Sequence, residues 1–294
     1  MKTVETDLLE IAYEEWGPAD GAPVVLLHGF PYDVRAFDEV APRLADAGHR
    51  VIAPYLRGFG PTRFLDESTE RSGQQAALGA DLLALLDALE IDTAVLAGFD
   101  WGARAACIVA ALWPERVAGL VSVDGYAVQD IAASGEPVPP AWEATYWYQY
   151  YFHGSRGKLG LEVNRDELCE LLWRTWSPTW NFSAETFAAS SPSLHNPDFV
   201  DVVVHSYRHR FGLAEGDPRY DDIETALAEA PPIIVPTIVL EPGADGILGG
   251  SADSDRERFV GPYGHERLAN TGHNVPQQAP REFARAILDL AAGA

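Results

Sequence analysis

The chain has 294 residues, a length that fits one large domain or one domain carrying a smaller insertion. Apolar residues make up 47% of it, which is enough for a large buried core. The formal net charge of −23 argues against nucleic acid and anionic membrane surfaces as partners, and no apolar run reaches membrane-spanning length.

Short apolar runs alternate with amphipathic segments along the first part of the chain. Buried strands are expected at 23–27, 50–56, 93–97 and 117–123, and helices at 72–90 and about 102–114. This alternation predicts a mostly parallel sheet that is covered by helices on both faces.

The pattern changes in residues 128–225, which hold five of the eight tryptophans. Helices are expected there near 139–152, 165–175 and 197–211, followed by a strand at 233–240 and a final helix at about 281–292. The sequence therefore predicts an α/β core formed by 1–127 and 226–294, interrupted by a helical cap at 128–225.

The two cysteines, Cys107 and Cys169, show neither a disulfide framework nor the spacing of a zinc site. Residues 1–16 lack the apolar core of a signal peptide. We therefore expect reduced, mostly buried thiols in a cytoplasmic protein. The sequence leaves the oligomeric state open, a homodimer included.

The sequence Gly98-Phe99-Asp100-Trp101-Gly102 falls between an expected strand and an expected helix. It has the form of a nucleophile elbow, with Asp where Ser is usual, and no G-x-S-x-G occurs in the chain. Since the reference pKa of Asp is about 3.9, its carboxylate is ionised at neutral pH and can attack saturated carbon to form an ester. A helix N-cap is the alternative use of Asp100.

Hydrolysis of such an ester requires an oxyanion hole and a general base. The loop His28-Gly29-Phe30-Pro31 follows the first buried strand, so the N–H groups of Phe30 and Trp101 are the expected oxyanion donors. His273, shortly before the last helix, is the expected base, and His265 in a charged segment is its nearest competitor.

Two aspartates follow expected strands, and either can orient the base. Asp245 follows the strand at 233–240, and Asp124 follows the strand at 117–123; Asp245 is preferred, with Asp124 as the alternative acid. His205 and His209 have an i,i+4 spacing but lack the Glu of a zinc-protease motif. No metal or other cofactor is expected.

With these motifs the chain resembles the epoxide hydrolases of the α/β-hydrolase fold. The likeness covers nearly the whole chain and is strongest in the three motifs His28-Gly29-Phe30-Pro31, Asp100-Trp101-Gly102 and Thr271-Gly272-His273. It implies an α/β-hydrolase fold with an inserted helical cap, and conversion of an epoxide to a diol through an ester on Asp100. It also implies two cap tyrosines that bind the epoxide oxygen. They correspond to Tyr148, with Tyr150 as a substitute, and Tyr207.

The expected substrate is a small or medium apolar epoxide, enclosed between core and cap. The residues expected near it are His28, Pro31, Arg104, Trp147, Gln149 and Tyr150. Haloalkane and fluoroacetate dehalogenases share the three motifs, and Arg104 resembles a carboxylate-binding Arg of the latter. This chain departs from haloalkane dehalogenases at Phe30, where they commonly carry Asn. It departs from fluoroacetate dehalogenases at Trp101 and Gln149, where they carry Arg and His. A non-catalytic binding protein on the same fold is the alternative from another class.

Overall fold

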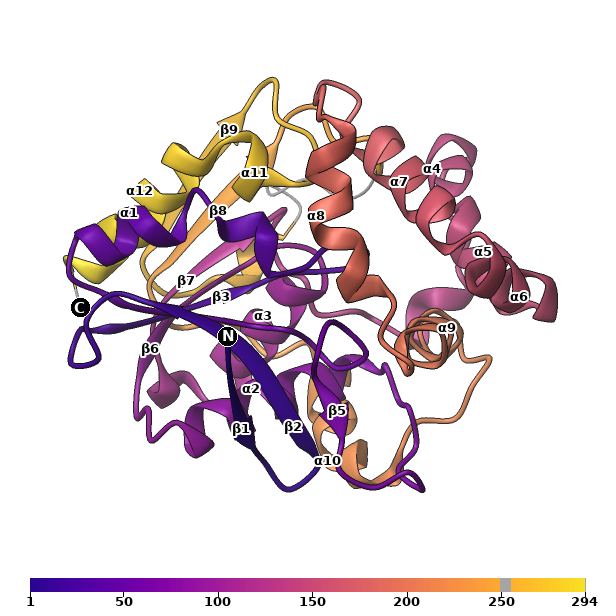
Figure 1. Ribbon diagram of the computed structural model, residues 1–294, viewed down its shortest axis with the longest axis horizontal. Coiled ribbons are helices and arrows are strands. Elements are labelled where there is room, and N and C mark those ends of the chain that lie inside the picture. Colours follow the sequence, from indigo (N-terminus) through magenta and orange to yellow (C-terminus); the bar gives the residue numbers. More distant parts are fainter. Residues whose placement is uncertain (249–254, 294) are drawn as a thin grey trace.

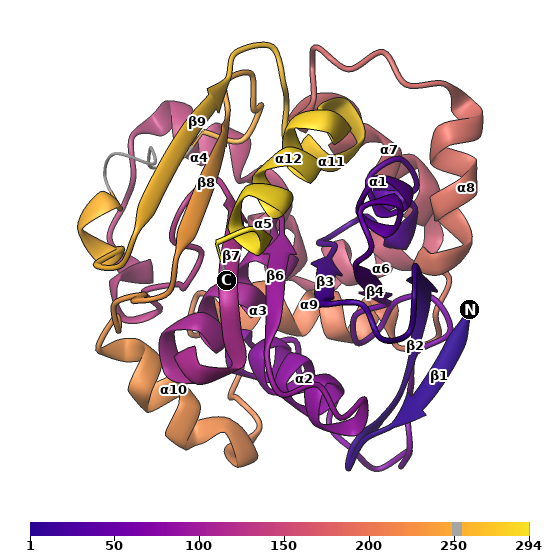
Figure 2. The ribbon, with the colours of Figure 1, turned by 90° about the vertical axis from the view of Figure 1, so that its left-hand side faces the viewer.

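The structure is a computed structural model that describes residues 1–248 and 255–293. The described residues form a nine-stranded sheet in the order β1-β2-β4-β3-β6-β7-β8-β9, with β5 paired to β2 (Figures 1 and 2). The strands are β1 Lys2–Glu5, β2 Leu9–Trp16, β3 Pro23–Leu27, β4 Arg50–Pro54, β5 Arg63–Phe64, β6 Ala94–Gly98, β7 Val117–Val123, β8 Thr237–Pro242 and β9 Tyr263–Leu268.

From β4 across to β9 the neighbouring strands run parallel, and only the edge formed by β1, β2 and β5 is antiparallel. The central strands β3 and β6 are almost fully buried, as expected for apolar strands covered on both faces. The expectation of an α/β fold with a mostly parallel sheet is therefore confirmed.

Helices from distant parts of the chain cover the two faces of the sheet. On one face α1 contacts α12, which packs on β7, and on the other α2 contacts α3, which packs on β6 and β7 (Figure 2). Two further short helices join them, α10 against α2 and α11 against α12. These core helices are α1 Ala41–Asp46, α2 Gln75–Ala88, α3 Trp101–Leu112, α10 Asp221–Ala228, α11 Val275–Gln278 and α12 Pro280–Ala291.

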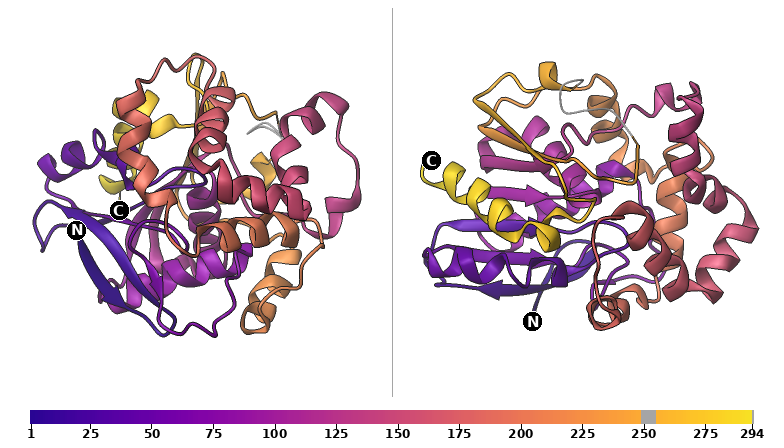
Figure 3. Two further views of the ribbon diagram at one scale, coloured as in Figure 1. Left: turned by 45° about the vertical axis from the view of Figure 1, so that its right-hand side comes forward. Right: turned by 90° about the horizontal axis from the view of Figure 1, so that it is seen from above.

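The segment between β7 and β8 is helical, and residues 124–232, all of them described, contain no strand. Apart from α10, which contacts α2, its helices gather at one end of the sheet (Figure 3). They are α4 Pro140–Thr145, α5 Trp147–His153, α6 Ser155–Val163, α7 Arg165–Trp176, α8 Ala184–Leu194 and α9 Phe199–His209. No helix in the described part of the chain is both long enough and apolar enough to cross a lipid bilayer.

Several elements differ from the sequence expectation, each for a local reason. The strand expected at 233–240 begins only at Thr237, because Pro236 has no N–H to donate, and Ile233 forms a single bridge with Phe259. The helix expected at 139–152 is broken near Tyr146 into α4 and α5. Helices α6 and α8 were not predicted, since α6 contains two glycines and α8 contains Pro192.

Candidate active site

Asp100 lies at the sharp turn between β6 and α3. Its backbone has φ 53° and ψ −123°, a conformation that a side-chain-bearing residue adopts only when its surroundings enforce it. The two flanking glycines allow this turn: a Cβ on Gly98 would lie 2.5 Å from the carbonyl carbon of Gly102, and one on Gly102 would overlap the carbonyl of Leu27. The turn presents the Asp100 side chain at the carboxyl end of the sheet. Among the described residues this side chain makes no helix-capping bond.

The Asp100 carboxylate is held by the backbone groups that the sequence singled out. The N–H of Phe30 donates to Oδ1 at 2.7 Å, and the adjacent N–H of Trp101 lowers the pKa of the carboxylate. Gly29 is required next to it, because a Cβ there would collide with the Asp100 side chain. Burial raises the pKa of Asp100, but His273, Arg104 and the Trp101 N–H outweigh burial, so the pKa lies below its ordinary value.

His273 lies between two carboxylates. Its Nδ1 is 2.7 Å from Oδ2 of Asp245, and its Nε2 is 3.5 Å from Oδ2 of Asp100. Burial lowers the pKa of His273, but the charges and hydrogen bonds of Asp245 and Asp100 outweigh it and raise the pKa to about 10. The imidazole is therefore protonated while Asp100 is ionised.

The structure brings Asp245, not Asp124, into hydrogen-bonding distance of His273. Asp124 follows β7 with a left-handed φ of 67° and forms no ion pair with His273 or any other part of the chain that the structure describes. Its side chain is exposed and lines the same cavity as Asp100 and His273, with protein atoms closely packed around it. Burial, together with the nearby negative charge of Asp245, raises the pKa of Asp124 to about 7.

Two of the three tyrosines named from the sequence are buried in contact with each other. Tyr148 on α5 and Tyr207 on α9 have ring centroids 5.3 Å apart, and the Gln149 amide donates to the Tyr148 hydroxyl at 3.0 Å. Burial raises the pKa of both hydroxyls, so both remain protonated at neutral pH. Tyr150 is 37% exposed, and its hydroxyl bonds Glu143.

A cavity of about 730 Å³ joins Asp100, His273 and Tyr148. Of the residues expected around the substrate, Arg104, Gln149 and Tyr150 line it, whereas His28, Pro31 and Trp147 do not. Each of the three has a structural reason. His28 is fully buried and accepts the Leu56 N–H, the carbonyl of Pro31 accepts the Trp173 indole N–H at 2.9 Å, and Trp147 is 38% exposed.

The sequence predicted an apolar substrate, but many of the residues that line the cavity are polar or charged. Carboxylates and two guanidinium groups line it together with aromatic rings. One of these groups, Arg210, was missed by the sequence analysis. The signal that could have found it is its position three residues after Tyr207, which is one helical turn further along the same face.

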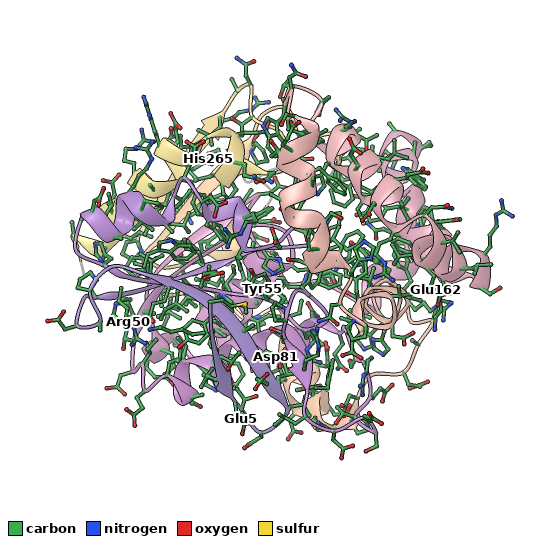
Figure 4. The ribbon with its side chains drawn as sticks, in the orientation of Figure 1. Glu5, Arg50, Tyr55, Asp81, Glu162 and His265 are labelled. Atoms are coloured by element: carbon green, nitrogen blue, oxygen red, sulfur yellow. The ribbon has the colours of Figure 1, made fainter. Side chains whose placement is uncertain are left out.

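The remaining histidines and cysteines lie outside this arrangement. His265 is on β9 (Figure 4). It bonds Glu241 of the neighbouring strand β8 at 2.9 Å. His205 bonds backbone groups of Gly73 and Glu215, and no cluster of metal ligands occurs within residues 1–248 and 255–293. Cys107 and Cys169 are free and buried, as expected.

A family model of the alpha/beta hydrolase fold matches residues 22–194. The chain belongs to the α/β-hydrolase fold family, and it is a hydrolase. Within that family it is similar over most of its length to proteins named epoxide hydrolases. It is 28% identical to epoxide hydrolase B of Mycobacterium tuberculosis, over 93% of this chain and 92% of the relative. It is 27% identical to epoxide hydrolase A of the same organism, over 99% and 97%.

A crystal structure of a candidate epoxide hydrolase from Klebsiella pneumoniae superimposes with a TM-score of 0.98 at 47% identity, covering 99% of this chain and 97% of that one. A haloalkane dehalogenase of Mycolicibacterium paratuberculosis is 33% identical over 48% of this chain and 44% of its own length. The full-length likeness is thus to proteins described as epoxide hydrolases.

Proposed function

We propose that this protein hydrolyses an epoxide to a vicinal diol through a covalent ester on Asp100. The observation that carries the proposal is an ionised carboxylate in a strained turn, held between the Phe30 N–H and the His273–Asp245 pair. The full-length similarity to proteins named epoxide hydrolases supports it. We also propose that 128–225 acts as a cap over a core made of 1–127 and 226–294.

In the first step Asp100 attacks a carbon of the epoxide ring. Since Oδ1 accepts the Phe30 N–H, Oδ2 is the oxygen that forms the new bond to carbon. The ring C–O bond breaks, and the oxygen takes a proton from the hydroxyl of Tyr148 or Tyr207. Burial favours the protonated hydroxyls, so a proton is available to an alkoxide at neutral pH.

In the second step water cleaves the ester. Esterification removes the negative charge of Asp100, which lowers the pKa of His273 and lets the imidazole give its proton to the tyrosinate left by the first step. Nε2 then accepts a proton from water, whose oxygen attacks the ester carbonyl. The bond between the carbonyl carbon and the alkyl oxygen breaks, this oxygen leaves as the second hydroxyl of the diol with the remaining water proton, and Asp100 returns to a carboxylate. The N–H groups of Phe30 and Trp101 stabilise the oxyanion, and Asp245 stabilises the imidazolium.

The second candidate function is a dehalogenase on the same scaffold. The partial likeness to a haloalkane dehalogenase favours it, because that relative is 33% identical where it matches. A halide leaves without taking a proton, so the two buried tyrosine hydroxyls would not act as proton donors in that reaction. This difference separates the two candidates experimentally.

The test uses a His273→Gln variant, which forms the ester but cannot hydrolyse it. Incubated with styrene oxide, its intact mass should rise by the full mass of the epoxide, and peptide mapping should place the adduct on Asp100. An Asp100→Asn/His273→Gln double variant is the matched control and should stay unmodified. No adduct from any of a panel of epoxides, together with a halogen-free alkyl adduct from a haloalkane, would select the dehalogenase instead.

A further inference from the structure

The two buried cap tyrosines differ in their access to the cavity. Tyr148 lines it together with Asp100, whereas Tyr207 is 1% exposed and is not among the described residues that line it. The nearby hydroxyl of Tyr207 lowers the pKa of Tyr148, so it acts on that phenol. A leaving oxygen in the cavity can therefore take its proton from Tyr148, with Tyr207 in support.

The amide of Gln149, the residue after Tyr148 on α5, is held in one orientation. Nη1 of Arg210 donates to its Oε1 at 3.2 Å, and its Nε2 donates to the Tyr148 hydroxyl at 3.0 Å. A guanidinium group has only donors, so it must face the amide oxygen, and the amide N–H groups must then face the hydroxyl. Arg210, Gln149 and Tyr148 thus form a hydrogen-bond chain in which both donated bonds run toward the phenol oxygen.

A phenol oxygen that accepts an N–H is prepared to give its own proton away. The accepted bond directs the O–H of Tyr148 away from Gln149, and it strengthens when the oxygen becomes negative, because hydrogen bonds to charged acceptors are stronger. The positive charge of Arg210 polarises the Gln149 amide and adds to this effect. The hydrogen-bond chain therefore stabilises a tyrosinate more than it stabilises the neutral phenol.

Arg210 also acts on Tyr148 directly through its charge. Burial raises the pKa of Tyr148, as does the negative charge of Asp100, and the charge of Arg210 offsets part of this rise. Its effect on the phenol is larger than that of any carboxylate, although Asp124 and Asp255 also line the cavity. Three further titratable side chains interact with this phenol, namely Tyr32, Arg104 and Tyr207.

We propose that Tyr148 is the residue that protonates the epoxide oxygen, and that Gln149 and Arg210 are positioning residues that stabilise its tyrosinate. This inference rests on the proposed function for the epoxide, but the stabilisation of the tyrosinate can be tested without turnover. When Asp100 attacks, the ring C–O bond breaks, and the electron pair left on the oxygen takes the Tyr148 proton. The hydrogen-bond chain holds the resulting negative charge until His273 returns a proton to the phenol oxygen.

The test without turnover replaces Tyr148 by 2,3,5-trifluorotyrosine, whose phenol is more acidic and whose ionisation fluorine NMR follows at this one position. Gln149→Leu and Arg210→Met in the labelled protein should each raise the ionisation midpoint by about one pH unit or more, a roughly tenfold weakening of the acid. Arg210→Lys keeps the charge and should recover part of that shift. Arg208→Met is the matched control: Nε of Arg208 donates to the carbonyl of Phe152, which also joins α9 to α5, so its loss should leave the midpoint in place.

The turnover arm follows ester formation on Asp100 from styrene oxide in single-turnover experiments on the unlabelled protein. Gln149→Leu and Arg210→Met should each slow this step by about 10–100-fold, because the phenol becomes a weaker acid. In a Tyr148→Phe background, which has no phenol to activate, adding Arg210→Met should slow the step by no more than roughly threefold. A purely structural role of Arg210 would instead give the same loss in both backgrounds.

Several results would overturn the inference. One is a midpoint that stays unchanged in folded Gln149→Leu and Arg210→Met variants, and another is an equal rise in Arg208→Met. A third is ester formation that is lost in Tyr207→Phe but kept in Tyr148→Phe, since the donor would then be Tyr207. Midpoints that move as expected, with no ester formed from any of a panel of epoxides, would remove the proposed function and leave the stabilisation of the tyrosinate standing.

Discussion

The charge of one side chain, Asp100, governs when His273 can act as a base. While Asp100 is ionised, His273 keeps a proton, because two carboxylates raise its pKa to about 10. Formation of the ester removes one of those charges and leaves only Asp245 beside the imidazole. We therefore expect water activation to begin only after the ester exists, which orders the two steps without any movement of the backbone.

Substitutions of Asp245 and Asp124 should show which of these two aspartates supports His273. Asp245→Asn removes the hydrogen-bonded charge from His273, so its pKa should fall and ester hydrolysis should slow by about 10²–10⁴-fold, with the ester accumulating. Asp124→Asn, the matched control, should change that rate by no more than roughly threefold, because it does not contact His273. Single-turnover rates measure both effects. A comparable loss in Asp124→Asn would show that Asp124 is the acid that His273 depends on.

The sequence identified those candidate site residues whose positions are set by a recognisable turn or loop of the backbone. The two glycines around Asp100 and the loop after the first parallel strand define Asp100, Trp101 and Phe30, and the structure brings these three together. The sequence favoured Asp245 but left Asp124 open as the alternative, because the two residues follow neighbouring strands of the sheet. Arg210 was missed because its position one helical turn after Tyr207 does not by itself show that this end of α9 faces the cavity.

At the scale of elements, the strands predicted from the sequence were those with uninterrupted apolar runs. Strand β7 was predicted with its observed bounds, and β3 likewise. The edge strands β1 and β9 were missed, since they are short or charged and half exposed, and their pairing comes from the neighbouring strand. A hydrophobic pattern reveals a strand only where its residues are buried, so half-exposed strands at the edge of a sheet are hard to predict from the sequence.

The turn between β6 and α3 gives a prediction about stability. Gly102→Ala would place a methyl group onto the backbone of Leu27, so it should lower the free energy of unfolding by about 2–4 kcal/mol. Gly135→Ala, where no atom lies within 4 Å of the added Cβ, is the control and should change it by less than about 0.5 kcal/mol. Urea unfolding at constant m-value measures the difference. Equal stability of the two variants would mean that the close approach of α3 to β3 is not required.

For the whole molecule, His273 should make stability depend on pH. Its pKa is about 10 in the folded protein and near the ordinary value of 6.5 when unfolded. The folded state therefore binds the extra proton between these values, and the stabilisation, fully present below pH about 6.5, is lost as the pH rises to about 10.

A His273→Gln variant lacks this proton, so its difference in unfolding free energy from the wild-type protein should shrink steadily as the pH rises through that window. Chemical denaturation at several pH values measures the difference for both proteins. A difference that stays constant with pH would show that His273 is not charged in the resting protein.

One bond described above links two distant parts of the molecule: the indole N–H of Trp173 on α7 donates to the carbonyl of Pro31, next to Phe30. Outward displacement of α7 would break this bond or pull the loop that aligns the Phe30 N–H with Asp100. We therefore expect substrate to enter and product to leave past the exposed segment around 130–136, and not past α7. Movement of that segment would leave the loop beside Asp100 in place.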